Sequence, residues 1–440
     1  MTYEEALDYI HGLYWRGKKS GLEKTKELSA LCGNPEKELQ FIHIAGTNGK
    51  GSTAAMLASV CRSAGLKTGL YTSPYIVRYN ERIQVDGEEI PDERLAALTG
   101  ELAQAAESME TPPSEFEFGT VLAFLYFREC HCDIVILETG LGGTFDSTNV
   151  ISSPLLCIIT ALGFDHTGQL GSTMREIALA KAGIIKEGTA VLFYGENEEG
   201  EEVLRERCRE LSVPLFLPDF KELVPERPGK LTLSGRDREE NCQCFSYRQW
   251  KHMTLALPGL YQQKNAALVL LAVEQLRQKG LSLPEEVVRK GLRTVRWQAR
   301  LEAVSDRPLL LVDGSHNPQG MKATVESLRQ YFPGRKLQFI FGVMADKEAE
   351  AIASIFLPFA KKVYVTAPDM PRAMKAEELL SLCKRLSGEE GGPKLVLCPT
   401  TEEALKAAAK EKEDEVIAAV GSLYLAGEIK KRLSHEAQPF

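Results

Sequence analysis

The chain has 440 residues, of which 44% are hydrophobic, and its formal net charge at pH 7 is -8. A chain of this length is too long for one ordinary core, so the sequence predicts two domains with enough apolar residues to fill both. The negative charge argues against a broad nucleic-acid-binding surface and leaves room for a local basic pocket that binds an anionic substrate.

Targeting and membrane-spanning segments are not expected. The first seven residues lack the basic region and apolar core of a secretory signal. The most apolar run, 155–164, is far shorter than the ~20 residues that span a bilayer. The ten cysteines are scattered and lack the C-x₂-C pairs of a zinc site, which predicts free thiols in a reduced compartment. We therefore expect a cytoplasmic protein that binds neither membrane nor nucleic acid.

The first predicted elements lead to a glycine-rich turn. A helix over 3–14 should serve for packing, and a buried strand over 41–45 precedes a helix over 53–61. Between strand and helix, the glycines lack the side chains that would keep a backbone from wrapping a phosphate, so N–H groups and a helix N-terminus can point at one anion. The turn comprises Gly46, Thr47, Asn48, Gly49, Lys50, Gly51, Ser52 and Thr53.

This turn carries the chemistry of a phosphate-binding loop. Lys50 supplies a mobile positive charge, and Ser52 or Thr53 supplies a hydroxyl for Mg²⁺. The pattern differs from G-x-x-x-x-G-K-[ST], because Gly51 separates the lysine from the hydroxyl residue. The flanking strand and helix favour nucleotide binding over a plain glycine turn.

Polar residues follow three further predicted strands. Ser73 precedes a proline that ends one strand, Glu138 ends the next, and Asp165 and His166 follow the third. Since ligands of open α/β sheets bind at the carboxyl ends of strands, we expect these residues at one edge, with Glu138 holding a metal ion. The alternatives are a solvated strand end for Glu138 and a structural role for His166. The strands are expected over 67–72, 133–138 and 155–160.

Lys181 lies among small and apolar residues in a predicted helix over 174–186. A buried lysine should either lose its proton or be modified. Before this helix, the sequence predicts a hairpin turn at 86–87 and helices from Pro91 and over 114–130. After it, we expect a strand over 189–194, an acidic helix over 198–211, β-hairpin segments around 231–233 and 242–257, and a helix opened by 258–265.

The last third of the sequence follows a linker expected over 291–300. Strands alternate there with helices, which predicts a mostly parallel sheet covered on both faces, with right-handed crossovers. The strands are expected over 308–312, 337–341, 362–366, 394–397 and 415–420, and the helices over 318–331, 348–358, 375–386, 401–411 and 422–433.

The turn with its lead-in His43-Ile-Ala resembles the variant phosphate loop of the Mur ligase superfamily, in particular its folylpolyglutamate synthase and dihydrofolate synthase branch. Other blocks carry the same resemblance in the same order along the chain: Ser73-Pro-Tyr-Ile with Glu81-Arg-Ile, the segment from Ala180 to Lys186, Pro258 to Asn265, Trp297 to Glu302, Asp313 to Pro318, Asp346-Lys347 and Gly421 to Gly427. Departures from the family pattern occur at Tyr75, Thr144, Ala180, Tyr261 and the Gln298-Ala299 pair.

The resemblance implies an α/β fold of two domains. An N-terminal phosphate-loop, Mur-ligase-like ATPase domain with a mostly parallel sheet is expected over 1–295, and a smaller C-terminal Rossmann-like α/β domain over 296–440. The active site would lie in the cleft between the two domains, and closure of the second domain about a hinge would complete it. We expect a monomer.

The implied activity is ATP-dependent and uses one or two Mg²⁺ ions. L-Glutamate would be added to the terminal glutamate carboxylate of a (tetrahydro)folate through an acyl phosphate, and some members also join dihydropteroate to glutamate. The alternatives are a Mur-type cell-wall amino-acid ligase, which needs a uridine-nucleotide site, and a phosphate-loop ATPase without ligase activity.

The resemblance also implies roles for individual residues. Lys181 would be carbamylated, Asn265 would contact the nucleotide, and Arg300 would reach the ATP phosphates; from sequence alone, Asn265 is equally a capping residue and Arg300 a surface residue. The expected catalytic set is Lys50, His166, Lys181, Asp313 and His316. The expected ATP-binding set is 46–53 with Asn265, Arg300 and Asp313, and the metal set is Ser52, Ser73, Glu138, His166 and Lys181.

Overall fold

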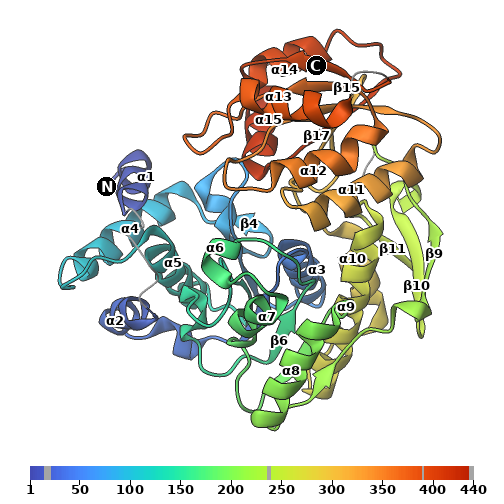
Figure 1. Ribbon diagram of the computed structural model, residues 1–440. Coiled ribbons are helices and arrows are strands. Elements are labelled where there is room, and N and C mark those ends of the chain that lie inside the picture. The colour runs from blue at the N-terminus through green and yellow to red at the C-terminus, as the bar shows by residue number, and fades with distance from the viewer. Residues whose placement is uncertain (14–20, 235–238, 389–390, 436–440) are drawn as a thin grey trace. The chain divides into compact units, whose positions relative to one another are not determined.

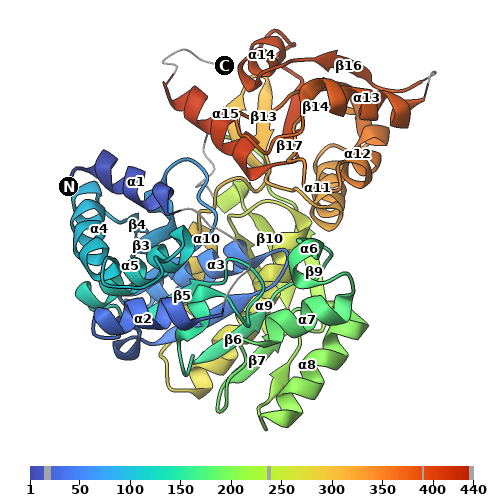
Figure 2. The ribbon, with the colours of Figure 1, turned by 60° about the vertical axis from the view of Figure 1, so that its left-hand side comes forward.

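A computed structural model describes residues 1–13, 21–234, 239–388 and 391–435 (Figures 1 and 2). The chain forms two compact units. Unit 1 comprises Met1–Phe220 and Asn265–Leu292, and unit 2 comprises Lys221–Lys264 and Arg293–Phe440. The second crossing lies close to the predicted boundary at 295–296, whereas segment 221–264, expected in the first domain, groups with unit 2.

Hydrogen bonds explain why that segment belongs to unit 2. The Tyr331 hydroxyl donates to the Pro228 carbonyl at 2.7 Å and accepts from the Gly259 N–H at 3.2 Å. The Leu260 N–H donates to Ser327 Oγ at 3.0 Å. These bonds tie both ends of the segment to one helix of unit 2.

Unit 1 is built on an eight-stranded sheet within the described ranges, in the order β4-β3-β2-β5-β1-β6-β7-β8. Strands β2, β5, β1, β6, β7 and β8 are parallel, and β3 and β4 add an antiparallel edge. The strands are β1 (Phe41–Ala45), β2 (Thr68–Tyr71), β3 (Ile83–Val85), β4 (Glu88–Glu89), β5 (Ile134–Glu138), β6 (Leu156–Ile159), β7 (Ala190–Phe193) and β8 (Leu215–Phe216).

The hairpin turn expected at 86–87 lies between β3 and β4. Helices pack around the sheet of unit 1. The α-helices are α1 (Tyr3–Gly12), α2 (Glu23–Leu31), α3 (Lys50–Ser63), α4 (Asp92–Ala106), α5 (Glu115–Glu129), α6 (Thr167–Leu170), α7 (Met174–Ala182), α8 (Glu198–Glu210), α9 (Leu260–Gln278) and α10 (Glu285–Thr294), of which α9 and α10 cross the division between the units. The 3₁₀ helices are η1 (Pro35–Glu38), η2 (Tyr79–Arg82) and η3 (Ser147–Val150). Helix α1 was predicted to reach residue 14, which lies outside the described residues.

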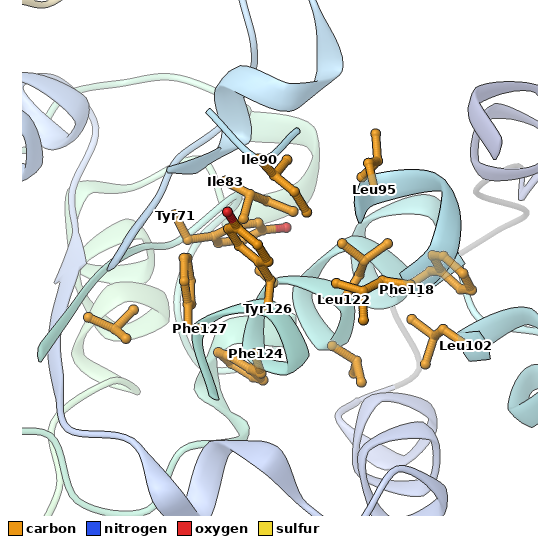
Figure 3. Close-up of a cluster of buried hydrophobic side chains, with 14 of the residues drawn as sticks. Tyr71, Ile83, Ile90, Leu95, Leu102, Phe118, Leu122, Phe124, Tyr126 and Phe127 are labelled. Atoms are coloured by element: carbon orange, nitrogen blue, oxygen red, sulfur yellow. The ribbon is translucent and has the colours of Figure 1, made fainter. Parts of the chain in front are cut away.

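One hydrophobic core of unit 1 fills the space between α4, α5 and one face of the sheet. Figure 3 shows Phe124 and Phe127 of α5 grouped with Tyr71 of β2. Phe41 of β1 meets Phe124 with the ring centroids 5.5 Å apart. Central strands β1 and β5 are buried at every residue, as expected for a parallel sheet covered on both faces.

Unit 2 holds two sheets in the part of the chain that is described. A six-stranded sheet has the order β12-β13-β17-β14-β15-β16, and a three-stranded antiparallel sheet has the order β11-β10-β9. The strands are β9 (Leu223–Arg227), β10 (Gln243–Tyr247), β11 (Trp250–Leu255), β12 (Glu302–Asp306), β13 (Leu309–Val312), β14 (Leu337–Phe341), β15 (Ala360–Val365), β16 (Lys394–Leu397) and β17 (Val416–Val420). The larger sheet is parallel except at β12, which pairs antiparallel with β13.

The larger sheet of unit 2 confirms the predicted alternation of strands and helices. Its α-helices are α11 (Pro318–Tyr331), α12 (Ala349–Phe356), α13 (Ala376–Ser387), α14 (Thr401–Ala408) and α15 (Leu423–His435), and its 3₁₀ helices, with those of segment 221–264, are η4 (Phe220–Glu222), η5 (Glu239–Asn241) and η6 (Leu357–Phe359). Strand β14 is buried at every residue. No helix among the described residues is long and apolar enough to cross a bilayer.

One predicted hairpin strand is wrong. Residues 231–233 form no strand, because the Asp306 carboxylate binds the Leu233 N–H at 2.7 Å and the Thr232 hydroxyl at 3.0 Å. A side chain therefore takes the backbone donor that a strand partner would need. The neighbouring prediction over 242–257 is confirmed by β10 and β11.

Candidate active site

The glycine-rich turn of unit 1 joins β1 to α3. Gly46 has φ 152° and Gly49 has φ 90°, values that disfavour residues with a Cβ. A Cβ on Gly46 would lie 1.8 Å from Thr160 Oγ1, and one on Gly49 would lie 2.8 Å from Asn265 Oδ1. Helix α3 begins at Lys50 rather than at Thr53 as predicted, since Gly49 takes the position before its first turn.

The turn is fastened to the segment that follows β6. The N–H groups of Thr47 and Asn48 donate to the Ala161 carbonyl at 2.9 and 3.1 Å. The Thr47 hydroxyl donates to the Gly163 carbonyl at 3.0 Å and accepts from the Gly163 N–H at 3.1 Å. The turn is therefore held in place beside Asp165 and His166, which come next in the chain.

Two lysines meet at one carbonyl of the turn. Lys50 Nζ donates to the Gly46 carbonyl at 3.1 Å, and Lys181 Nζ donates to the same oxygen at 2.8 Å. The pKa of Lys181 is lowered to about 7, chiefly by burial and also by the charge of Lys50, while Asp165 and Asp146 act in the opposite direction. Together with the positive end of the α3 dipole, the lysines make this an environment suited to an anion.

Glu138 lies at the end of β5, directly beside β1. It is buried, it pairs in register with Ile44, and its Oε2 accepts the Ser73 N–H at 3.3 Å. Ser73 follows β2, the other neighbour of β5. The predicted convergence of strand ends is therefore present for the turn, Ser73 and Glu138, and the turn in addition reaches Asn265.

His166 is more exposed than the turn, Ser73 and Glu138. Its side chain is 41% exposed, and its Nε2 lies 3.8 Å from Asp165 Oδ1. The residue has φ 52° at the start of α6. Ser52 and Thr53, by contrast, are buried in the first turn of α3.

Sequence reasoning missed a buried polar chain that runs from the loop after Glu138 to His43 of β1. Asp146 accepts the Leu141 N–H at 2.7 Å and the Thr148 hydroxyl at 2.6 Å. Because Thr148 gives its only hydroxyl proton to Asp146, His43 Nε2 must donate in its 2.8 Å contact with Thr148 Oγ1. Burial lowers the pKa of His43 to about 3, so the imidazole is neutral. The signal in the sequence is Asp-Ser-Thr-Asn over 146–149.

The same loop holds the end of helix α7. The Thr144 N–H and hydroxyl both donate to the Ala180 carbonyl, at 2.8 and 3.0 Å. Asn149 Nδ2 donates to the carbonyls of Thr144 and Gly183 at 3.1 Å each. The position of Lys181 therefore depends on the segment that follows Glu138.

In unit 2, Asp313 follows β13 and is buried. Its carboxylate accepts four hydrogen bonds within unit 2: from the Leu301 N–H at 2.9 Å, the Tyr261 hydroxyl at 3.3 Å, the Ser315 N–H at 3.0 Å and the Thr324 hydroxyl at 2.9 Å. Asp313 thus fixes the turn that carries Arg300. His316 Nδ1 contacts the Gly314 carbonyl at 2.8 Å, and Arg300 Nη1 donates to the Ala299 carbonyl at 2.7 Å.

Comparison with known proteins gives these residues a context. Residues 44–273 match the family model of the Mur ligase middle domain, and residues 299–423 match that of the Mur ligase glutamate ligase domain. The chain is 36% identical to dihydrofolate synthase/folylpolyglutamate synthase of Bacillus subtilis, over 98% of this chain and 99% of that protein. It belongs to the folylpolyglutamate synthase and dihydrofolate synthase branch of the Mur ligases.

Other members of this Mur ligase branch agree in sequence and fold. The chain is 34% identical to folylpolyglutamate synthase of Lacticaseibacillus casei, over 98% of this chain and 99% of that protein. The Mycobacterium tuberculosis folylpolyglutamate synthase complexed with ADP and AMPPCP superposes with a TM-score of 0.86 at 28% identity, over 99% of this chain and 100% of that one. A folylpolyglutamate synthase in complex with AMPPCP and folate superposes with a TM-score of 0.82 at 32% identity, over 98% of this chain and 100% of that one. The family and α/β fold predicted from the sequence are confirmed.

Proposed function

We propose that this Mur ligase uses ATP to add L-glutamate to the terminal glutamate carboxylate of a reduced folate. The observation that supports this most is the glycine turn on which Lys50 and Lys181 converge, next to the strand end that carries Glu138. The Lacticaseibacillus casei relative, matched over 98% of this chain, is a folylpolyglutamate synthase, and a similar folylpolyglutamate synthase structure holds AMPPCP and folate.

The chemistry requires an activated carboxylate, because a carboxylate has no good leaving group. A folate carboxylate oxygen attacks the γ-phosphorus of ATP, the bond to ADP breaks, and an acyl phosphate forms. The glutamate amine then attacks the acyl carbon, inorganic phosphate leaves, and a proton is released. The chain contributes positioning and positive charge, through Lys50 and the N-terminus of α3, rather than a covalent intermediate.

The residues present fit Mg²⁺. Within the described residues, no three His, Cys, Asp or Glu side chains are grouped so that they hold a metal ion by themselves. Mg²⁺ is commonly held by one or two carboxylates together with substrate phosphates, and Glu138 with the hydroxyls of Ser52 and Ser73 meets that requirement. Bound there, Mg²⁺ would neutralise phosphate charge, and a neutral His166 would be a further ligand.

Lys181 is proposed to carry a carbamate in the active enzyme. A pKa of about 7 leaves much of the amine neutral at physiological pH, so its nitrogen is able to bond to the carbon of CO₂ and release a proton. The product is an anion beside Lys50, which would replace the repulsion between two cations. Incubation with ¹³C-labelled CO₂ should give a carbamate carbon resonance in the wild type that is missing in Lys181→Met.

In unit 2, Arg300 is proposed to bind the ATP phosphates, because its planar guanidinium suits an oxyanion. His316 is proposed to act on the reacting groups, and Asp313 to hold the turn between them through its four hydrogen bonds. In unit 1, Asn265 is proposed to contact the nucleotide next to Gly49.

A second activity, the joining of dihydropteroate to glutamate, is favoured by the name of the Bacillus subtilis relative and by the 32% identity to dihydrofolate synthetase of Saccharomyces cerevisiae, over 79% of this chain and 81% of that protein. One experiment tests both activities. The enzyme is incubated with ATP, Mg²⁺ and labelled glutamate, with tetrahydrofolate, dihydropteroate or neither in parallel tubes.

Labelled product and ADP in the tetrahydrofolate tube are the expected result. Product with dihydropteroate adds the second activity. ADP release at the same rate in every tube, without product, would instead indicate an ATPase and overturn the proposal. His166→Ala should lower turnover more than nucleotide affinity; an equal loss of both would make His166 structural.

A further inference from the structure

The turn that carries Arg300 has a backbone conformation that its own residues disfavour. Ala299 has φ 52° and Leu301 has φ 45°. These left-handed values cost free energy in any residue with a Cβ, and a branched leucine is a poor choice for them. Something outside the turn must therefore stabilise it.

Lys430, on helix α15, is in direct contact with this turn. Its Nζ donates to Gln298 Oε1 at 2.6 Å and to both Glu302 carboxylate oxygens at 2.8 Å. Glu302 Oε2 in turn accepts the Ala299 N–H at 2.9 Å. The ammonium thus holds the side chains on both sides of Arg300, and through Glu302 it also fixes the backbone.

The contacts of Lys430 with Glu302 are largely shielded from water. The Lys430 and Glu302 side chains are only 18% and 14% exposed, so water competes weakly for either charge. Two further hydrogen bonds fix the backbone of the turn: the Leu301 N–H donates to the side-chain oxygen Asp313 Oδ2, and the Gly314 N–H donates to the Ala299 carbonyl at 2.9 Å. Arg300 therefore extends from a backbone that is held at both ends.

We propose that Lys430 is a positioning residue, which sets the place of the Arg300 guanidinium by clamping Gln298 and Glu302. This rests on the proposed role of Arg300 at the ATP phosphates. Gln298-Ala299 contains neither the proline nor the glycine that commonly form such a turn. A Pro-Gly pair would favour such a turn through its own backbone preferences, whereas this chain relies on a side-chain clamp from a distant helix.

A purely structural role for Lys430 predicts something different. As a simple attachment of α15 to the sheet, the ion pair would affect stability without affecting ATP more than the other substrates. Unit 2 offers a matched control, the ion pair of Lys362 with Glu411, whose side chains are 21% and 20% exposed. This pair lies at β15 and makes no contact with the Arg300 turn among the interactions of the described residues.

The test compares steady-state kinetics of the full-length variants Lys430→Met, Lys430→Arg, Lys362→Met and Arg300→Ala, with unfolding measured for each. We expect Lys430→Met to raise KM for ATP roughly tenfold, with kcat and the folate KM changed less than about twofold. Lys430→Arg should restore most of the loss, and Lys362→Met should leave the ATP KM unchanged.

A second arm places Lys430→Met in a Gln298→Pro, Ala299→Gly background. If the clamp acts through the turn, the Pro-Gly pair should reduce the effect of losing Lys430 to about twofold or less. An equal effect in both backgrounds, or a rise in ATP KM shared by Lys362→Met, would overturn the proposal.

The Arg300→Ala variant distinguishes a failure of the Lys430 clamp from a failure of the proposed role of Arg300 at the ATP phosphates. A raised ATP KM in Arg300→Ala with none in Lys430→Met refutes the clamp and leaves the role of Arg300 intact. An unchanged ATP KM in Arg300→Ala refutes that role itself. Hydrogen exchange of the peptide over 298–302 provides a readout independent of activity, and it should rise in Lys430→Met and stay unchanged in Lys362→Met.

Discussion

Lys181 Nζ donates a 2.8 Å hydrogen bond to the carbonyl oxygen of Gly46, a residue 135 positions earlier in the chain. The bond connects the end of α7 to the glycine-rich turn. It also places a basic group inside the protein, where loss of hydration penalises its charged form. Lys181 therefore affects both stability and the charge of the site.

Replacing Lys181 with methionine should stabilise the protein. The pKa falls from its ordinary 10.5 to about 7 on folding, so between pH 7 and 10.5 the unfolded chain holds a proton that the folded chain lacks. Wild-type stability should therefore rise with pH across this window. Below pH 7 the protein carries the full free-energy cost of burying the protonated Lys181 amine. Lys181→Met should add on the order of a few kcal/mol at pH 6 and flatten this rise.

Urea unfolding at pH 6, 8 and 10 in CO₂-free buffer measures the effect of Lys181→Met. Lys26→Met, which changes an exposed lysine on α2, is the control and should follow the wild type. Parallel pH profiles for Lys181→Met and wild type would contradict a buried, deprotonating amine. Ligase activity should be lost in Lys181→Met, since the proposed carbamate needs the amine.

His43 should make the protein sensitive to acid. Its pKa of about 3 lies below the ordinary 6.5, so its contribution to stability is complete above pH 6.5 and is lost as pH falls toward 3. The expected slope is about 1.4 kcal/mol per pH unit within that window. His43→Gln, which retains an N–H donor for Thr148, should reduce this slope.

Unfolding by urea between pH 7 and pH 4 checks the His43 prediction. His131→Gln serves as a control, because His131 is exposed. If His43→Gln keeps the full acid sensitivity of the wild type, other groups must be responsible for it.

The sequence predicted where residues lie in the fold when their position depends on local pattern. The turn, Ser73 and Glu138 were placed correctly because each follows a strongly apolar strand of a parallel sheet. The pairing of His43 with Thr148 was missed because it joins residues 105 positions apart in the chain, and Asp146 stands out only through its bond to Thr148.

Element boundaries failed where a tertiary contact decided them. Helix α7 ends at Ala182 rather than at 186, and the neighbouring Gly183 carbonyl is held by Asn149. Strand β12 was not predicted, since it is a short antiparallel edge with the mixed sequence Glu-Ala-Val-Ser-Asp. Neither signal is visible in hydrophobic periodicity alone.

Replacing Ala299 with glycine should stabilise unit 2. Ala299 has φ 52°, and glycine removes the steric cost of that conformation while it adds entropy to the unfolded chain. The net gain should be about 0.5–1 kcal/mol. Ala105→Gly within helix α4 should have the opposite sign and a similar size. Thermal unfolding distinguishes the two, and destabilisation by Ala299→Gly would mean that the turn does not require the left-handed conformation.

Replacing Glu138 with glutamine should separate charge from structure at the centre of the site. The glutamine oxygen is still able to accept the Ser73 N–H, but the negative charge proposed to hold Mg²⁺ is lost. Turnover should fall roughly 10²–10³-fold and the Mg²⁺ concentration for half-maximal activity should rise, while the free energy of unfolding stays the same or increases. Glu36→Gln is a matched control, because Glu36 is a buried carboxylate of unit 1 that is bonded to Ser29; it should leave the Mg²⁺ dependence unchanged. Wild-type turnover and Mg²⁺ dependence in Glu138→Gln would show that this strand end holds no metal ion, and the placement of Mg²⁺ among Glu138, Ser52 and Ser73 would then be wrong.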